Sequence, residues 1–156
     1  MYSCDDIFDL AIQIEKNGER TLRKAQEKIS NPKLIPLLKW LADEEVEHAQ
    51  WLLQLKSAKQ KPIENPELEA FGKSLLRDIL GDQSFSLADA DFTKIKKAHQ
   101  LLSLMIEFEN DIILFYEMIR SVISDKEALE CVDKIIAAEN RHVKELQAFI
   151  DMEVQS

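Results

Sequence analysis

The feature of this sequence that most constrains its fold is a pattern that occurs twice, at a fixed offset of 94 residues. In each occurrence, mostly apolar residues recur at alternating steps of three and four, which is the spacing of one face of an α-helix. The first half carries two such faces, Phe8, Ala11, Glu15, Gly18, Leu22, Ala25 and Ile29, then Leu34, Leu38, Leu41, Glu45, His48, Leu52 and Leu55. The second half repeats them as Leu102, Met105, Glu109, Ile112, Tyr116, Ile119 and Ile123, then Ala128, Val132, Ile135, Glu139, His142, Leu146 and Phe149.

These faces predict an all-α protein with four long helices, at about 4–29, 31–58, 93–124 and 126–153. The first two helices are joined tightly, and so are the last two, which indicates two antiparallel hairpins of one bundle. Within the second helix, Asn31 is a good N-cap and Pro32 suits the first helical position. Pro36 lies a turn further on and lacks a backbone donor, which predicts a kink or a short 3₁₀ turn at the start.

Residues 59–92 differ in character and contain two of the four prolines and two of the three glycines. A short amphipathic helix is expected at 67–80, where Gly81 would end it. So few residues cannot bury a core of their own, and we interpret them as a crossover between the hairpins. Residues 1–156 are accordingly expected to form one domain.

The net charge of −9 comes from 29 acidic and 20 basic residues. Such an acidic surface repels phosphates, and because no basic stripe is evident in it, nucleic acid is not an expected partner. No apolar stretch approaches the roughly 20 residues needed to span a bilayer, so a membrane is not expected either. The first residues carry acids where a secretory signal carries Lys or Arg, which indicates a cytoplasmic protein.

The two cysteines, Cys4 and Cys131, lie 127 positions apart and form no Cys-x-x-Cys pair. The sequence therefore predicts neither a rubredoxin-type iron site nor a zinc ribbon, and no disulfide framework. We expect Cys131 to be an ordinary, partly buried thiol in a reduced protein. Cys4 has no neighbouring base that would activate it.

The helical faces are apolar except at one level, which carries Glu15, Glu45, His48, Glu109, Glu139 and His142. Burying four carboxylates without compensation would cost several kcal/mol per charge. Two dications such as Fe²⁺ or Mn²⁺ would neutralise them. The ligand set matches that of di-iron and di-manganese bundles, with one Glu from each of two helices and a Glu-x-x-His pair from each of the others. The alternative is a polar layer held only by hydrogen bonds.

With these residues in place, the sequence resembles the ferritin-like di-iron carboxylate superfamily, and most closely its rubrerythrin-like branch. The resemblance rests on AIQIEKNGERTLRKA, WLADEEVEHAQWL, MIEFENDIILFY and AAENRHVKELQ, and it covers all four long helices. It implies that Glu15 and Glu109 are terminal ligands and that Glu45 and Glu139 bridge two iron ions. His48 and His142 would then each cap one ion, with manganese or zinc as substitutes for iron.

The resemblance implies an oxidoreductase that reduces hydrogen peroxide or dioxygen, and a homodimer. Typical rubrerythrins add a rubredoxin domain held by four cysteines, which this sequence does not contain, so the electron donor is expected to be a rubredoxin-like protein or a flavoprotein. They also have a further carboxylate where this sequence has Ile112, and that change makes the site resemble a bacterioferritin ferroxidase centre. No fifth, cage-closing helix is evident. A ferroxidase without a storage cage and a metal-stabilised bundle that binds a partner therefore stay open as alternatives.

Tyr116 is the candidate catalytic residue beyond the ligands, because it lies on the same helical face two turns after Glu109. Its hydroxyl could hydrogen-bond a ligand carboxylate or reduced oxygen, or it could serve an unrelated buried partner. The neighbours Glu19, Glu44 and Glu47 lie off the faces and are expected in solvent.

Overall fold

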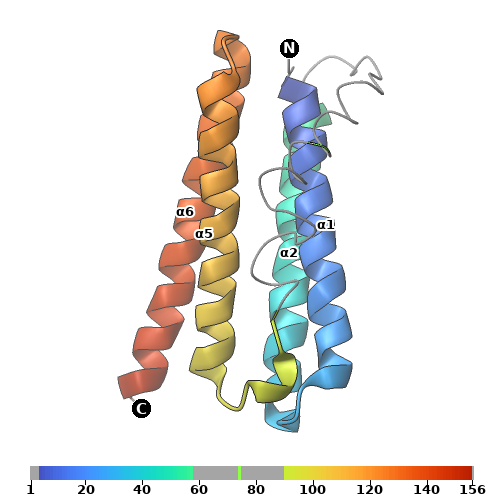
Figure 1. The fold of residues 1–156 in the computed structure, drawn as a ribbon, viewed down its shortest axis with the longest axis vertical. Helices are drawn as coiled ribbons and strands as arrows, with labels where there is room; N and C mark the ends of the chain where they lie inside the picture. The colour runs from blue at the N-terminus through green and yellow to red at the C-terminus, as the bar shows by residue number, and fades with distance from the viewer. Residues whose placement is uncertain (1–3, 58–73, 75–89, 156) are drawn as a thin grey trace.

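Four long helices make up most of the protein, and the computed structural model describes residues 4–57, 74 and 90–155. They are α1 (Cys4–Lys28), α2 (Ile35–Ser57), α5 (Ala98–Val122) and α6 (Lys126–Gln155). Figure 1 shows the hairpin of α1 and α2 beside the hairpin of α5 and α6. The described residues contain no strand. The predicted all-α four-helix bundle is confirmed.

The second helix begins as its prolines predict. A 3₁₀ turn, η1 (Pro32–Leu34), precedes α2, and the Asn31 side chain caps this turn by accepting a hydrogen bond from the Lys33 amide. Pro36 is the second residue of α2, where the helix has no use for its missing N–H. The same Asn31 side chain donates to the carbonyl of Lys96 (2.8 Å), which links this connection to the segment before α5.

The third helix begins five residues later than predicted, at Ala98 rather than at about residue 93. A separate 3₁₀ turn, η2 (Phe92–Lys94), occupies the expected start, because the Asp91 side chain accepts from the Thr93 amide. Further on, the Gln100 side chain accepts from the amides of Lys96 and Lys97. Because these hydrogen bonds fix a backbone that is not α-helical at residues 91–97, α5 begins only at Ala98. The helix expected at 67–80 and most of the crossover at 59–92 lie outside the described residues.

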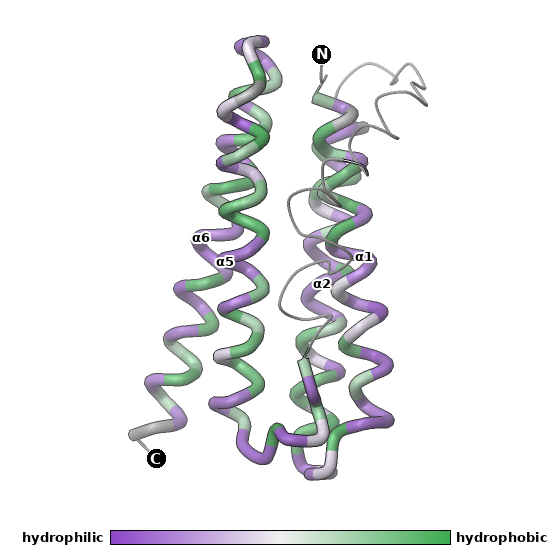
Figure 2. Tube along the Cα trace, viewed as in Figure 1, coloured by the Kyte–Doolittle hydropathy of each residue, from purple (hydrophilic) through white to green (hydrophobic). Residues whose placement is uncertain are grey.

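The predicted helical faces form the core. Nearly all of their apolar members are buried, including Leu22, Leu38, Ile112 and Val132, none of which has measurable exposure. Along each helix in Figure 2, apolar and polar segments alternate, as expected for helices with one buried side. The prediction was wrong for Phe149, whose side chain is 43% exposed and packs edge-on against Trp40. Phe149 lies near the end of α6, which diverges from the other helices in Figure 1.

A disulfide joins Cys4, at the start of α1, to Cys131, near the start of α6. Their Cα atoms are 5.9 Å apart, within the range that a disulfide requires. The prediction of two reduced thiols was therefore wrong. With 127 residues between the cysteines, no local spacing indicates the pair, and only the topology of the bundle, which starts α1 and α6 at the same end, brings them together.

None of the helices in the described ranges combines the length and apolar character that crossing a membrane requires.

Candidate metal site

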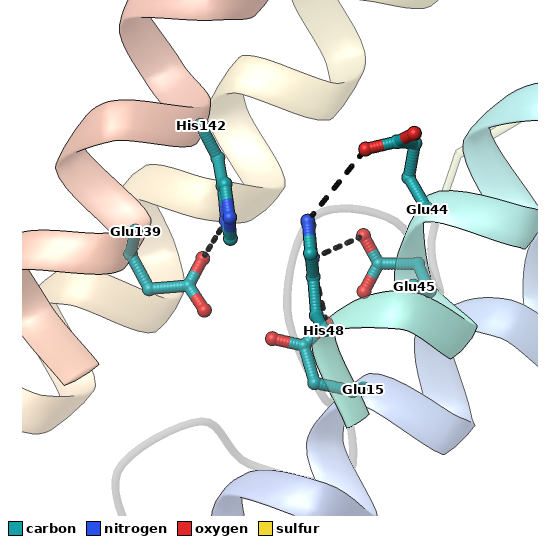
Figure 3. A network of polar contacts seen from close by, with 6 residues as sticks. All are labelled: Glu15, Glu44, Glu45, His48, Glu139 and His142. Carbon is teal, nitrogen blue, oxygen red and sulfur yellow. Dashed lines mark hydrogen bonds and ion pairs between the residues drawn. The ribbon is translucent and has the colours of Figure 1, made fainter. Parts of the chain in front are cut away.

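Six side chains from four helices meet in the middle of the bundle. Glu15 comes from α1, Glu45 and His48 from α2, Glu109 from α5, and Glu139 and His142 from α6. Each Glu-x-x-His pair places its two side chains on one helical face about a turn apart. Figure 3 shows the two histidines facing each other between the hairpins. Their rings are stacked, with centroids 3.6 Å apart and planes within 5° of parallel.

The Nδ1 atoms of both histidines point toward carboxylates. His48 Nδ1 lies 3.5 Å from Glu15 Oε2 and 3.8 Å from Glu45 Oε1. His142 Nδ1 lies 3.3 Å from Glu139 Oε2. Two overlapping groups have ligand atoms close enough to share an ion, namely Glu15–Glu45–His48 and His48–Glu109–His142. The structure thus brings together all six residues that the sequence singles out, and their binding of metal stays a prediction.

Several buried polar atoms of this cluster have no hydrogen-bond partner. Each of the four glutamates is at most 3% exposed. Within the described residues, Glu15 Oε2, Glu45 Oε2, Glu109 Oε2 and His48 Nδ1 are buried without a hydrogen-bond partner. An unsatisfied buried polar atom costs about 1–3 kcal/mol, and more if it is charged. Oxygen and imidazole nitrogen donors left open around one point suit a transition-metal dication, so the residues present fit the metal.

The pKa values of the four glutamates also indicate a site suited to a cation. Burial, followed by the negative charge of neighbouring carboxylates, raises the pKa of Glu15, Glu45 and Glu109 well above the ordinary value. Burial also opposes the ionised form of Glu139. That effect is outweighed by hydrogen bonds from Glu109, His142 and Glu15, which lower the pKa of Glu139 to about 2. Without a cation, the cluster therefore retains protons that solvent-exposed carboxyl groups would lose.

A narrow cavity of about 20 Å³ reaches the cluster between α2 and α6. Its lining includes the exposed Trp40 and Glu145, the half-buried Glu44, and the buried Glu45 and Glu109. Such a volume holds only one or two water-sized molecules. A cavity of this volume beside the cluster suits a molecule the size of water or peroxide.

Sequence reasoning assigned Glu44 to solvent, whereas the structure places it in the cavity wall with Oε2 4.0 Å from His48 Nε2. Figure 3 shows its carboxylate directed at the outer edge of the His48 ring. The spacing of Glu44 and His48 could have predicted this contact, because residues four apart lie on the same face of a helix. Glu19, in contrast, pairs with Arg23 on the surface.

The repeat is not symmetric around the cluster. Gly18 lies one turn after Glu15 and is replaced in the second half by Ile112, which is fully buried. Tyr116 takes the place of Leu22. Tyr116 is buried, and its burial, followed by the negative charges of Glu139, Glu15 and Glu109, raises the pKa of its hydroxyl well above the ordinary value.

A four-helix bundle with this ligand arrangement belongs to the class of ferritin-like carboxylate proteins. A family model, Rubrerythrin, matches residues 6–150. The chain therefore belongs to the rubrerythrin family, which is a ferritin-like di-iron family. No curated protein and no solved structure matches the chain significantly.

Proposed function

We propose that the chain is a di-iron oxidoreductase that reduces hydrogen peroxide, and dioxygen as a second oxidant, with electrons from a separate donor. The observation that carries the proposal is the convergence of four buried glutamates and two histidines, several of whose polar atoms have no partner. Bound iron would supply the redox chemistry by passing between the ferrous and ferric states. Each peroxide molecule takes up two electrons and two protons and yields two water molecules.

The six side chains would hold two ions, with Glu15, Glu45 and His48 as ligands from one hairpin and Glu109, Glu139 and His142 as ligands from the other. Four carboxylates contribute a charge of −4, which two Fe²⁺ ions cancel. The side chains around the ligands exclude bulk water, and the narrow cavity favours an oxidant the size of peroxide over a bulky organic hydroperoxide.

Tyr116 is proposed to hold a proton at its hydroxyl beside the ligand carboxylates. Because its pKa is raised, the hydroxyl stays protonated throughout the neutral range and can donate a hydrogen bond to a carboxylate or to reduced oxygen. Tyr116→Phe should leave the bound metal unchanged and slow peroxide reduction about tenfold or more. Metal analysis and stopped-flow absorbance of the same samples check this expectation. An unchanged rate would assign Tyr116 to packing alone.

Metal analysis of protein purified without oxygen, followed by stopped-flow mixing with peroxide, tests the main proposal. The natural sequence should bind two iron ions per chain, which raises the melting temperature, and should be reoxidised faster than free Fe²⁺. The double variant Glu45→Ala/Glu139→Ala should lose the metal and the rise in melting temperature. A matched control, Glu47→Ala/Glu130→Ala, removes two exposed carboxylates from the same two helices and should retain both. Unchanged metal content and melting in the first variant would contradict the assignment.

A ferroxidase is the second candidate function, and the buried Ile112 favours it. With no carboxylate at that position, the two halves supply equivalent ligand sets, which resembles a bacterioferritin ferroxidase centre. Repeated cycles of peroxide and reductant separate the two functions. Iron that stays at two ions per chain supports the peroxide reductase, whereas iron that leaves the site and forms a mineral supports the ferroxidase.

A further inference from the structure

The outer surface of α1 carries a row of four positive charges. Lys16, Arg20, Lys24 and Lys28 follow each other at steps of four, and all four side chains are exposed. Residues four apart are neighbours on a helix surface, so these side chains form a continuous row, which we call the cationic ridge. No basic stripe was evident in the sequence of this acidic chain, and the exposed ridge corrects that expectation.

The cationic ridge forms no ion pair within the described part of the chain, although Glu19 and Glu27 line the same surface. None of its four side chains forms an ion pair there, whereas the adjacent Arg23 pairs with Glu19 (2.6 Å) and Asp43 (3.0 Å). Like charges at a spacing of four repel each other and weaken a helix. A chain with 29 acidic residues could easily neutralise them. The unpaired row therefore suits an anionic partner from outside the chain.

The position of the ridge relates it to the metal site. Lys16 directly follows Glu15, whose carboxylate belongs to the buried cluster, so one end of the ridge lies level with that cluster. Lys16 and Glu15 belong to the same helix, and a helix with its side chains is about 10–12 Å across. A protein seated at the Lys16 end of the ridge would therefore hold a surface cofactor within about one helix diameter of the site.

We propose that the cationic ridge is the docking surface for the electron donor, a small acidic protein with a surface flavin or iron–sulfur centre. This inference rests on the proposed function, which requires a separate donor. Opposite charges steer the encounter, and salt weakens that effect. Without the four ridge charges the rest of the chain sums to −13, so it repels an acidic partner and directs docking to the ridge. The donor gives up two electrons for each peroxide reduced, and no bond forms between the proteins.

Calorimetric titration of the iron-loaded full chain with an acidic flavodoxin tests the docking surface. The ridge variant Lys16→Glu/Arg20→Glu/Lys24→Glu should weaken binding about tenfold or more at low salt and reduce its salt dependence. A matched control, Lys33→Glu/Lys39→Glu/Lys94→Glu, makes the same change of charge on exposed lysines outside the ridge. It should change the affinity less than threefold. The neutral variant Lys16→Gln/Arg20→Gln/Lys24→Gln should fall between the natural sequence and the charge reversal.

Equal weakening by the ridge variant and its control would overturn the proposal, because net charge alone would then explain binding. Tighter binding of a single-stranded RNA oligonucleotide than of flavodoxin, lost in the same ridge variant, would also overturn it by identifying a nucleic-acid surface. Reoxidation of dithionite-reduced protein by peroxide should be the same in all variants. If peroxide does not reoxidise the natural sequence, the proposed function is contradicted, whereas the docking surface is still tested by the difference in flavodoxin binding between the ridge variant and its control.

Discussion

At the scale of single residues, Gly18 shows how closely α1 approaches the candidate metal ligands. A Cβ atom at this position would lie 3.0 Å from Cζ of Phe108 and 3.2 Å from Oε2 of Glu45. Ordinary side-chain contacts are longer, so glycine is what allows the Phe108 ring and the Glu45 carboxylate to pack against α1. The second half of the repeat has Ile112 at this position, which indicates that the two metal positions differ in the space beside them.

Gly18→Ala should weaken metal binding about tenfold, because the added methyl group displaces Glu45 from its position. Alanine favours a helix over glycine by about 1 kcal/mol, so the metal-free protein should lose little stability. Titration with Fe²⁺ without oxygen measures the affinity. Adding Phe108→Leu should restore part of it by making room for the methyl group, and Asn17→Ala, one residue away, should have no effect. Full affinity in Gly18→Ala would show that Glu45 adjusts freely.

At the scale of elements, Asn31 links the connection between α1 and α2 to the segment that precedes α5, at one end of the bundle. Its side chain caps η1 through the Lys33 amide and donates to the Lys96 carbonyl. Asn31→Ala should lower the free energy of unfolding by about 1–2 kcal/mol, since it removes both the cap and this bond. Asn31→Asp keeps the acceptor for the cap but loses the donor, so its loss should be smaller. Urea unfolding of the three proteins measures the differences, and equal losses would mean that only the bond to Lys96 matters.

The elements could be predicted where the signal is local or periodic. The 3₁₀ turn before α2 follows from Asn31, Pro32 and Pro36, whose backbone restrictions act within a few residues. The start of α5 could not be predicted, because Asp91 and Gln100 form caps whose effect depends on how the chain turns. The exposure of Phe149 was missed for another reason. Its spacing continues the helical face, but periodicity does not report where the opposite hairpin ceases to cover that face.

At the scale of the whole molecule, the buried carboxylates should make the metal-free protein sensitive to pH. Glu15, Glu45 and Glu109 have raised pKa values, so the native state binds more protons than the unfolded state above their ordinary value of 4.5. The free energy of unfolding should therefore fall as the pH rises above about 4.5, by up to about 1.4 kcal/mol per pH unit for each proton involved. Glu139, with its pKa lowered to about 2, has the opposite effect on stability. Its ionised form contributes to the free energy of unfolding above about pH 4.5, and this contribution is lost as the pH falls toward 2.

Urea unfolding with a chelator at pH 5 and pH 7 tests this dependence. The metal-free protein should be more stable at pH 5, and Glu45→Gln/Glu109→Gln should reduce the difference because these amides do not titrate. The iron-loaded protein should not be more stable at pH 5 than at pH 7, since the ions keep the carboxylates in their charged form. Greater stability of the metal-free protein at pH 7 would contradict the prediction.

The disulfide should contribute to stability because it closes a long loop. Cys4 and Cys131 are 127 positions apart, and in the chain-entropy model a loop of about 100 residues is stabilised by about 4.7 kcal/mol. Reduction by dithiothreitol should lower the free energy of unfolding by about that amount. The double variant Cys4→Ser/Cys131→Ser should have the lower stability from the outset and should not respond to the reductant. If reduction leaves the natural protein equally stable, the cross-link does not restrict its unfolded state.

The six residues of the candidate site were predictable, because Glu-x-x-His spacing and the repeat both act along the helices. The cavity and the role of Glu44 in its wall depend instead on how the hairpins pack, which periodicity does not fix. The disulfide could not be predicted for the same reason, since its two cysteines are far apart in sequence and become neighbours only when the helices pack together.

The repeat gives each position of the first hairpin an equivalent in the second, and the disulfide breaks that equivalence. The positions equivalent to Cys4 and Cys131 are Ala98 and Leu37, two apolar side chains that pack against the core. One end of the bundle is therefore joined covalently, while the opposite end is held by apolar packing and by hydrogen bonds that Ser30 and Asn31 form with the segment before α5. Breaking the disulfide would therefore affect one end of the bundle and leave the bonds at the other end in place, so the two ends of a repeated structure differ in how they are held.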